Sequence, residues 1–327
     1  MSRFLLRRFL NYLVLLFVAV SLAYMLAGTS MNPISVFDRT NPNLDIAAIE
    51  RMLTEFNLNK DVPLLERYWN WLQGVVTSWD WGRTPQGGYV NEILSVRIWV
   101  SVRLITIGSF IGIIGGVALG AWSATKHHKL ADHVVTLISL IIISTPVIVL
   151  ATLLQIGAIQ FNNITGTNFF EFMGETGTIG SYPGADLVNR LQHLLLPTIS
   201  MSLGGIATYS RYQRNLMLDT LGADYVRTAR AKGLRKGTAV RRHALRTALV
   251  PMATYFAFVI AGLFTGATIT ERVYAWHGMG DYSITSITGQ DINGTVAVVA
   301  FSAACTFAGL MLADIFTVVV DPRVRVS

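Results

Sequence analysis

Six apolar stretches of the chain are each close to the roughly 20 residues that an α-helix needs to cross a lipid bilayer. They lie at Phe9–Ala27, Ile98–Trp122, Val134–Ile159, Leu194–Ser210, Leu249–Thr270 and Thr295–Val320. Of the 327 residues, 52% are hydrophobic and only 14% are charged, whereas soluble domains carry about a quarter charged residues. Backbone groups inside a bilayer must be hydrogen-bonded within the protein, which favours helices. The predicted fold is therefore all-α and integral to the membrane, with six transmembrane helices.

The distribution of basic residues among the loops predicts how these helices are oriented. If both termini are cytoplasmic, the inner segments hold seventeen of the 26 Lys and Arg residues, ten of them between Arg211 and Arg246. Short loops rich in Lys and Arg stay on the cytoplasmic side. The first apolar stretch follows Arg3, Arg7 and Arg8, but it exceeds the apolar core of a secretory signal and no clear cleavage site follows it. We expect a multi-pass protein with an uncleaved N-terminal anchor and both termini in the cytoplasm.

The segment between the first and second apolar stretches carries two amphipathic helical patterns. The second pattern follows Asp61 and Pro63, which are helix start signals. The apolar faces comprise Ile46, Ile49, Leu53 and Phe56 in the first helix and Leu64, Leu65, Tyr68, Trp69 and Leu72 in the second. Two interpretations are open: helices that lie at the membrane interface, or an external platform at Ile46–Leu72 for a partner or a substrate gate. The predicted organisation is residues 1–97 for the first transmembrane helix with an extracytoplasmic helical loop, and residues 98–327 for a five-helix transmembrane domain.

Small residues and one proline predict how the helices pack. Gly112, Gly116 and Gly120 recur every four residues, so they form a seam on which another helix can approach closely. The partner of this seam is either another helix of the same chain or a second membrane subunit. Pro146 interrupts the third apolar stretch and predicts a kink there.

The most basic segment of the chain, within the inner loop 211–248, contains a short helical pattern. Residues Tyr225–Lys232 contain no helix breaker, and Gly233 follows where a helix commonly ends in a left-handed turn. A loop held at both ends by membrane spans is a poor reader of nucleic acid. Attraction to lipid headgroups explains the charge, but a thin helix containing alanine and ended by glycine also suits a groove on another protein.

Several chemistries leave no trace in the sequence. The chain has no GxxxxGK[ST] phosphate loop, so it is predicted not to be an ATPase. Cys305 is its single cysteine, and no Cys/His pattern suggests a metal site. No chain of intramembrane carboxylates and histidines suggests a proton-coupled carrier. We therefore expect no catalytic, cofactor or metal residues in this chain, and an energy source outside it.

Five motifs are distributed over essentially the whole chain. They are DYVRTARAKG (Asp224–Gly233), RHALR (Arg242–Arg246), LERYWNWL (Leu65–Leu72), WHGMG (Trp276–Gly280) and DPRVR (Asp321–Arg325). With these motifs the sequence resembles a known family, the permeases of ABC importers, and most closely the B-type permease of oligopeptide and dipeptide uptake systems, in which the first motif is the coupling segment. The general importer motif begins Glu-Ala-Ala, of which only Ala229 is present here, and Arg246 occupies the place of its later proline.

The resemblance implies a type I ABC importer permease in the bacterial plasma membrane that forms one half of a pore for oligopeptides or dipeptides. Its implied partners are a homologous C-type permease, two ABC ATPase subunits or domains that bind ATP and Mg²⁺, and an extracytoplasmic peptide-binding protein. The residues implied to couple the permease to the ATPase are Asp224, Tyr225, Ala229, Arg230 and Gly233. No residue is assigned to the peptide. Transport of nickel or another small solute is the alternative, and a secondary carrier or a membrane scaffold without a pore is a more distant one.

Overall fold

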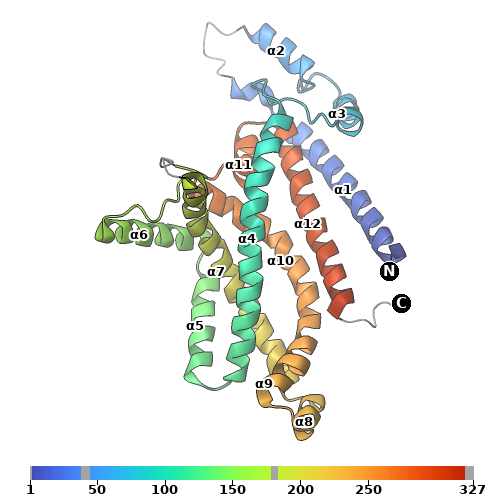
Figure 1. Cartoon of the computed structure of the whole chain (residues 1–327). Helices are drawn as coiled ribbons and strands as arrows, with labels where there is room; N and C mark the ends of the chain where they lie inside the picture. Colours follow the sequence, from blue (N-terminus) through green and yellow to red (C-terminus); the bar gives the residue numbers. More distant parts are fainter. Residues whose placement is uncertain (1, 38–44, 178–182, 321–327) are drawn as a thin grey trace. The chain divides into compact units, whose positions relative to one another are not determined.

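The computed structural model describes residues 2–37, 45–177 and 183–320, and in these ranges the chain is helical without β-strands (Figure 1). Within the described ranges, four helices are long and apolar enough to cross a membrane. They cover Leu5–Ser30, Val90–Thr125, Val147–Thr165 and Ile292–Phe316. The predicted all-α membrane protein is therefore confirmed, whereas the predicted number of six spans stays a prediction. The motif at Asp321–Arg325 lies outside the described residues.

The described chain forms two compact units, and one of them joins Ser2–Val102 with Trp276–Phe307. Its helices are α1 (Ser2–Ser30), η1 (Pro33–Val36), α2 (Ile46–Glu55), α3 (Leu64–Ser78), α11 (Met279–Thr288) and the first parts of α4 (Val90–Thr125) and α12 (Ile292–Val320). The predicted division after Arg97 lies close to the first boundary of this unit. The sequence did not indicate that a segment near the other end of the chain joins it.

The other unit contains Arg103–Ala275 and the chain from Ala308 onward. Besides the remainders of α4 and α12, its helices are α5 (Leu130–Ser144), α6 (Val147–Thr165), α7 (Ala185–Leu221), α8 (Asp224–Ala231), α9 (Lys236–Ala239), the π-helical segment η2 (Val240–Leu245) and α10 (Arg246–Val273). This unit holds the whole basic segment.

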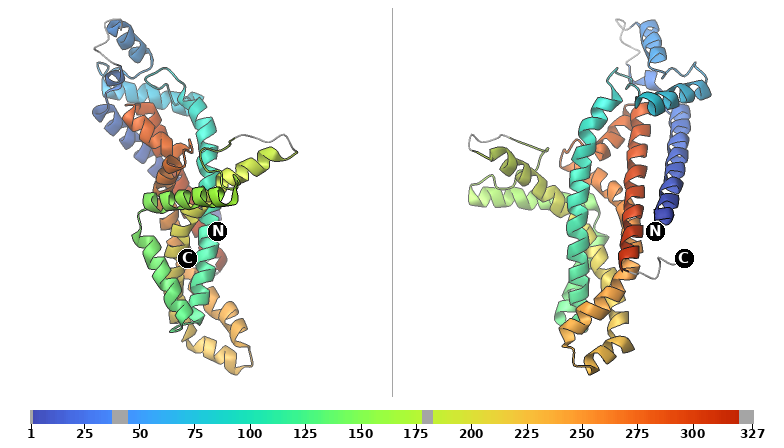
Figure 2. Two further views of the ribbon diagram at one scale, coloured as in Figure 1. Left: turned by 90° about the vertical axis from the view of Figure 1, so that its left-hand side faces the viewer. Right: turned by 45° about the vertical axis from the view of Figure 1, so that its right-hand side comes forward.

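The third apolar stretch is divided into two helices rather than forming one span. α5 ends at Ser144 and α6 begins at Val147, and Figures 1 and 2 show α6 crossing the direction of α5 at a steep angle. Pro146 has no N–H with which to continue the helix, and it restricts Thr145 to extended backbone (φ −88°, ψ 126°). The Thr145 hydroxyl donates to the Ile141 carbonyl oxygen over 2.7 Å. The kink predicted at Pro146 is confirmed as a complete break, and α5 alone is too short to count as a span.

The glycine seam of α4 packs against α7 of the same chain. A Cβ atom at Gly112 would lie 3.4 Å from the Gly205 Cα atom, and one at Gly116 would lie 2.5 Å from the Tyr209 Cβ atom. At Gly120 a Cβ atom would overlap a backbone carbonyl oxygen of α7. Only glycine permits so close an approach. Of the two interpretations of this seam, packing within the chain is therefore confirmed.

The helices α2 and α3 occupy the segment where the sequence predicts two helices. Trp71 is 5% exposed and packs against Tyr24 with 4.9 Å between ring centroids and an interplanar angle of 31°, whereas Leu65 and Trp69 are 71% and 64% exposed. A position at the membrane interface and an external platform both stay predictions for this segment. The aromatic contact to α1 turns Trp71 inward, and it leaves Leu65 and Trp69 for lipid or a partner.

Candidate coupling site

The segment Asp224–Ala231 forms the short helix α8, within one residue of the predicted limits at each end. Asp224 lies in its first turn and Arg230 in its last turn. The partial charges at helix ends favour an acid at the start and a base at the end, so both residues stabilise this helix. The local sequence is therefore consistent with an independently formed helical turn rather than an irregular basic tether.

Gly233 ends α8 in a left-handed turn, as the sequence predicts. Its φ angle is +91°. The Gly233 N–H donates to the Arg230 carbonyl oxygen over 3.0 Å, and the Leu234 N–H donates to the Ala229 carbonyl oxygen over 3.3 Å. This pair of hydrogen bonds is the Schellman arrangement, in which glycine is strongly preferred because residues with a Cβ atom are strained at positive φ. The chain direction after α8 therefore depends on Gly233.

The two sides of α8 differ completely in exposure. Val226 and Ala229 are 3% and 7% exposed, whereas the side chains of Asp224 and Arg227 are 98% and 74% exposed. Successive residues of an α-helix are rotated by about 100°, so Val226 and Ala229 share one face and Asp224 and Arg227 lie on the opposite one. One side of α8 is thus held by the chain and the other is free to contact another molecule.

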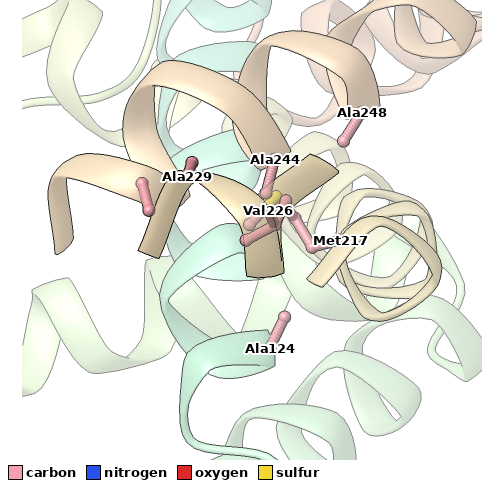
Figure 3. Close-up of a cluster of buried hydrophobic side chains, with 7 residues drawn as sticks. Ala124, Met217, Val226, Ala229, Ala244 and Ala248 are labelled. Carbon is pink, nitrogen blue, oxygen red and sulfur yellow. The ribbon is translucent and has the colours of Figure 1, made fainter. Parts of the chain in front are cut away.

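The buried side of α8 rests on a cluster of small side chains, defined here as the support cluster (Figure 3). Besides Val226 and Ala229, its members are Ala124 of α4, Met217 of α7, Ala239 of α9, Ala244 of η2 and Ala248 of α10. Five of these seven residues are alanine, so the helices approach closely around α8. The buried side of α8 therefore shares one packed cluster with the ends of α4, α7 and α10.

The five residues implied to couple the permease to an ATPase do not form one surface. Asp224, Tyr225, Arg230 and Gly233 are exposed, with Tyr225 and Arg230 flanking the outward face of α8. Ala229 is buried in the support cluster. Its methyl group is therefore covered by the chain itself, and a role of Ala229 in coupling stays a prediction.

A buried ion pair beside the support cluster was missed by the sequence analysis. Arg214 of α7 donates from Nε to Asp132 Oδ1 over 2.5 Å and from Nη2 to Asp132 Oδ2 over 2.7 Å. Ser123 of α4 donates to Asp132 Oδ1 over 2.5 Å. Asp132 lies in the first turn of α5, before the apolar run that begins at Val134. We call these residues the Asp132 clamp, because they connect α4, α5 and α7.

The clamp keeps the Asp132 carboxylate ionised. Its side chain is 1% exposed, and the hydrogen bonds from Arg214 hold the pKa of this carboxyl well below its usual range, with Ser123 contributing in the same direction. Ser123 precedes Ala124 of the support cluster, and Arg214 lies about one helical turn before Met217. The helix ends beneath α8 are thus fixed to one another. The only signal in the sequence was an isolated acid in an otherwise basic segment.

The exposed surface around α8 is strongly positive. Its exposed cations are Arg227, Arg230, Lys232, Arg235, Lys236, Arg241, Arg242 and Arg246. Among the described residues, the one ion pair of this set is the long and exposed contact of 3.9 Å between Arg227 and Asp224, which contributes little. Within the same described ranges, no group of three His, Cys, Asp or Glu side chains is arranged to hold a metal ion. The surface suits contact with an anionic partner.

Comparison with known proteins places the chain among transport proteins. Residues 116–326 match the family model described as "Binding-protein-dependent transport system inner membrane component". The chain is 44% identical to the oligopeptide transport system permease protein OppB of Mycobacterium tuberculosis over 329 aligned positions that cover 100% of both chains. It is 30% identical to the dipeptide transport system permease protein DppB of Lactococcus lactis, covering 99% of this chain and 100% of the relative.

A third relative is more distant. The oligopeptide transport system permease protein AppB of Bacillus subtilis is 27% identical over 87% of both chains. The family model includes the whole of α8, the support cluster and the clamp residues Ser123, Asp132 and Arg214. With a family model that matches well over half of its length and relatives that align from end to end, this chain belongs to the family of binding-protein-dependent transport system inner membrane components.

Proposed function

We propose that this protein is a pore-forming permease subunit of an ATP-driven ABC importer that takes up oligopeptides or dipeptides. The observation that carries the proposal is the end-to-end similarity, at 44% identity, to a permease named for oligopeptide transport. A second relative that aligns over its whole length is named for dipeptide transport. Peptide is therefore favoured over nickel or another small solute.

The proposed energy source is a pair of ABC ATPase subunits or domains that bind ATP and Mg²⁺ and dock on the exposed face of α8. This face is presented on a short helix whose other side is fixed to the support cluster, so it can act as a lever on α4, α7 and α10. Closure of the ATPases on ATP would displace α8, and the helix ends around it would follow as a body. The permease then exchanges its inward-facing and outward-facing arrangements.

The proposed topology has six spans, with both termini and α8 in the cytoplasm of a bacterial plasma membrane. The eight exposed Lys and Arg residues around α8 support this orientation, because short basic loops remain on the cytoplasmic side. A homologous C-type permease would complete the pore. The exposed apolar side chains of α6, such as Ile148, Leu153 and Ile156, are available to contact it or the bilayer.

The segment Ile46–Leu72 is proposed to lie at the extracytoplasmic mouth of the pore and to contact the peptide-binding protein or the partner permease. It contains α2 and the first part of α3, and its side chains Leu65 and Trp69 are exposed. A connection of this length usually has a function of its own. If it receives the loaded binding protein, replacing it with a short Gly/Ser linker should abolish stimulation of the ATPases by that protein while leaving the ATPases bound.

Reconstitution of the complete importer tests the proposal. The chain, its partner permease, the ATPases and the binding protein are placed in proteoliposomes, and accumulation of a radiolabelled oligopeptide and of Ni²⁺ is measured. We expect peptide uptake that requires both ATP and the binding protein. Uptake of nickel without peptide would replace the substrate, and peptide uptake driven by an ion gradient without ATP would contradict the proposed energy source.

A further inference from the structure

A cavity of about 600 Å³ lies between the end of α4 and the segment formed by α9 and η2. Trp122 and Lys126 border it on one side, and Lys236, Val240, Arg241 and Leu245 border it on the other. All of these residues belong to the same compact unit, and Figure 1 shows α9 near the end of α4. The cavity is separate from the exposed face of α8.

The lining of this cavity is divided between apolar surface and positive charge. Trp122, Val240 and Leu245 provide the apolar part, whereas Lys126 and Lys236, together with Arg241, provide three cations. No acidic residue lines the cavity in the part of the chain that the structure describes. None of the three cations has an ion-pair partner among the residues that the structure describes. The cavity therefore suits a molecule with an apolar part and a negatively charged group.

The π-helical segment η2 brings the apolar part of the wall together. Val240 and Leu245 are five residues apart and both line the cavity. In an α-helix, residues five apart would lie about 140° apart around the axis. The wider turn of a π-helix, with its i→i+5 hydrogen bonds, brings such residues closer to the same side. This rare backbone form thus turns Leu245 toward the same space as Val240 and Arg241.

The position of the cavity identifies its occupant. α4 is one of the helices long and apolar enough to cross the membrane, and its span ends at Thr125. Trp122 lies in the last turn of that span, is 47% exposed, and is a residue type that gathers at the level of lipid headgroups. Lys126 follows directly. Acyl chains are available at this level to cover the apolar wall, and anionic headgroups are available to neutralise the three cations.

We propose that this cavity binds an anionic phospholipid of the bilayer, with its phosphate held by Lys126, Lys236 and Arg241. Met217 lines the cavity and also belongs to the support cluster. A bound lipid would therefore fix α9 and η2 against α4 next to the surface on which α8 rests. The lipid composition of the membrane would in this way influence how firmly α8 is held.

The chain offers a matched set of variants for the test, because each lining cation has an exposed basic neighbour that does not line the cavity. The site variant carries Lys126→Gln, Lys236→Gln and Arg241→Gln. The control variant carries Lys129→Gln, Arg235→Gln and Arg242→Gln and loses the same net charge. Both variants are purified as the complete importer, and retained phosphatidylglycerol and phosphatidylcholine are counted by native mass spectrometry in mixed-lipid nanodiscs.

We expect the wild-type and control complexes to retain phosphatidylglycerol in preference to phosphatidylcholine. The site variant should bind phosphatidylglycerol at least about tenfold more weakly, because each basic residue at a membrane surface contributes substantially to binding. Soluble glycerol phosphate should not displace the lipid, since it cannot cover the apolar wall.

Three results would overturn the proposal. Equal loss of phosphatidylglycerol in the site and control variants would reduce the effect to general surface charge. Displacement by glycerol phosphate would identify a site for a soluble anion. Loss of the ATPase subunits from the site variant, with lipid retention unchanged, would make the cavity a protein-docking surface instead.

Discussion

Replacing Gly233 with alanine should weaken the contact between α8 and the proposed ATPase subunit without disturbing the membrane helices. Gly233 has a φ angle of +91°, and a Cβ atom there would meet no atom within 4 Å. The cost therefore comes from backbone conformation alone and is about 1–2 kcal/mol. A cost of that size shifts the population of the ordered turn by about 5–30-fold. The turn should open, and the exposed face of α8 should lose its fixed orientation.

Gly222, which precedes α8 in the chain, provides the matched control. A Cβ atom added at Gly222 would also meet no atom within 4 Å, but the φ angle of Gly222 is −82°. Gly222→Ala should therefore leave the protein unchanged. Gly233→Asn should be milder than Gly233→Ala, because asparagine tolerates left-handed backbone better, and Gly233→Val should be the most severe.

The assay is ATP hydrolysis by the assembled importer in nanodiscs, with and without loaded binding protein. The stimulated rate should fall in the order glycine, asparagine, alanine, valine at position 233, while the amount of permease in the membrane stays constant. If Gly233→Ala and Gly222→Ala behave alike, or if the order at position 233 follows side-chain size rather than tolerance of positive φ, the assigned role of this turn is wrong.

Three further predictions concern the supports beneath α8. Ala229→Trp should overfill the support cluster and destabilise the isolated permease by about 1–3 kcal/mol in thermal unfolding. Ala231→Trp, on the exposed side of α8, should alter only ATPase binding. Equal losses of stability in the two variants would contradict this prediction. Gly120→Ala should disrupt the contact of α4 with α7 and lower the melting temperature, but Gly204→Ala, with no atom within 4 Å, should be neutral or slightly stabilising. Asp132→Asn should destabilise the fold by up to about 3 kcal/mol, because it leaves the partly buried Arg214 without its counter-charge. The pKa of Asp132 is depressed in the folded protein. Its contribution to the free energy of unfolding should therefore be fully present above the ordinary carboxyl pKa of about 4 and lost only as the pH falls below that value. A loss of this contribution between pH 5 and pH 8 would refute the prediction.

The sequence predicted α8 well because its limits depend on local signals. Residues Tyr225–Lys232 contain no helix breaker, Gly233 determines where the helix ends, and both hydrogen bonds of the final turn are present. The kink at Pro146 and the packing seam at Gly112 are local in the same sense. Each depends on what one residue type permits in the backbone.

The sequence does not determine which side of a helix faces its neighbours. Ala229 is covered by residues that are distant in sequence, such as Ala124 and Ala248. Periodicity gives the angle between side chains but not the direction of the core. The burial of Trp71 in α3 was unpredictable for the same reason, because its contact with Tyr24 is made across more than forty residues of chain.

The Asp132 clamp could not be predicted from spacing. Asp132 and Arg214 are more than eighty residues apart, and no local pattern pairs them. A buried acid generally requires a nearby cation. This rule alone suggested that Asp132 has a basic partner, and the basic segment contains many candidates.

The most direct test of the account is a cysteine scan of α8 in the assembled importer. Cys305 is the chain's single cysteine, so replacing it with alanine gives a background for single substitutions. Arg227→Cys and Thr228→Cys place the thiol on the exposed face, and Val226→Cys and Ala229→Cys place it on the buried face. If α8 docks by its exposed face, we expect crosslinks to the ATPase subunit from the two exposed positions and none from the two buried ones. Crosslinks from the buried positions, or from all four equally, would contradict it.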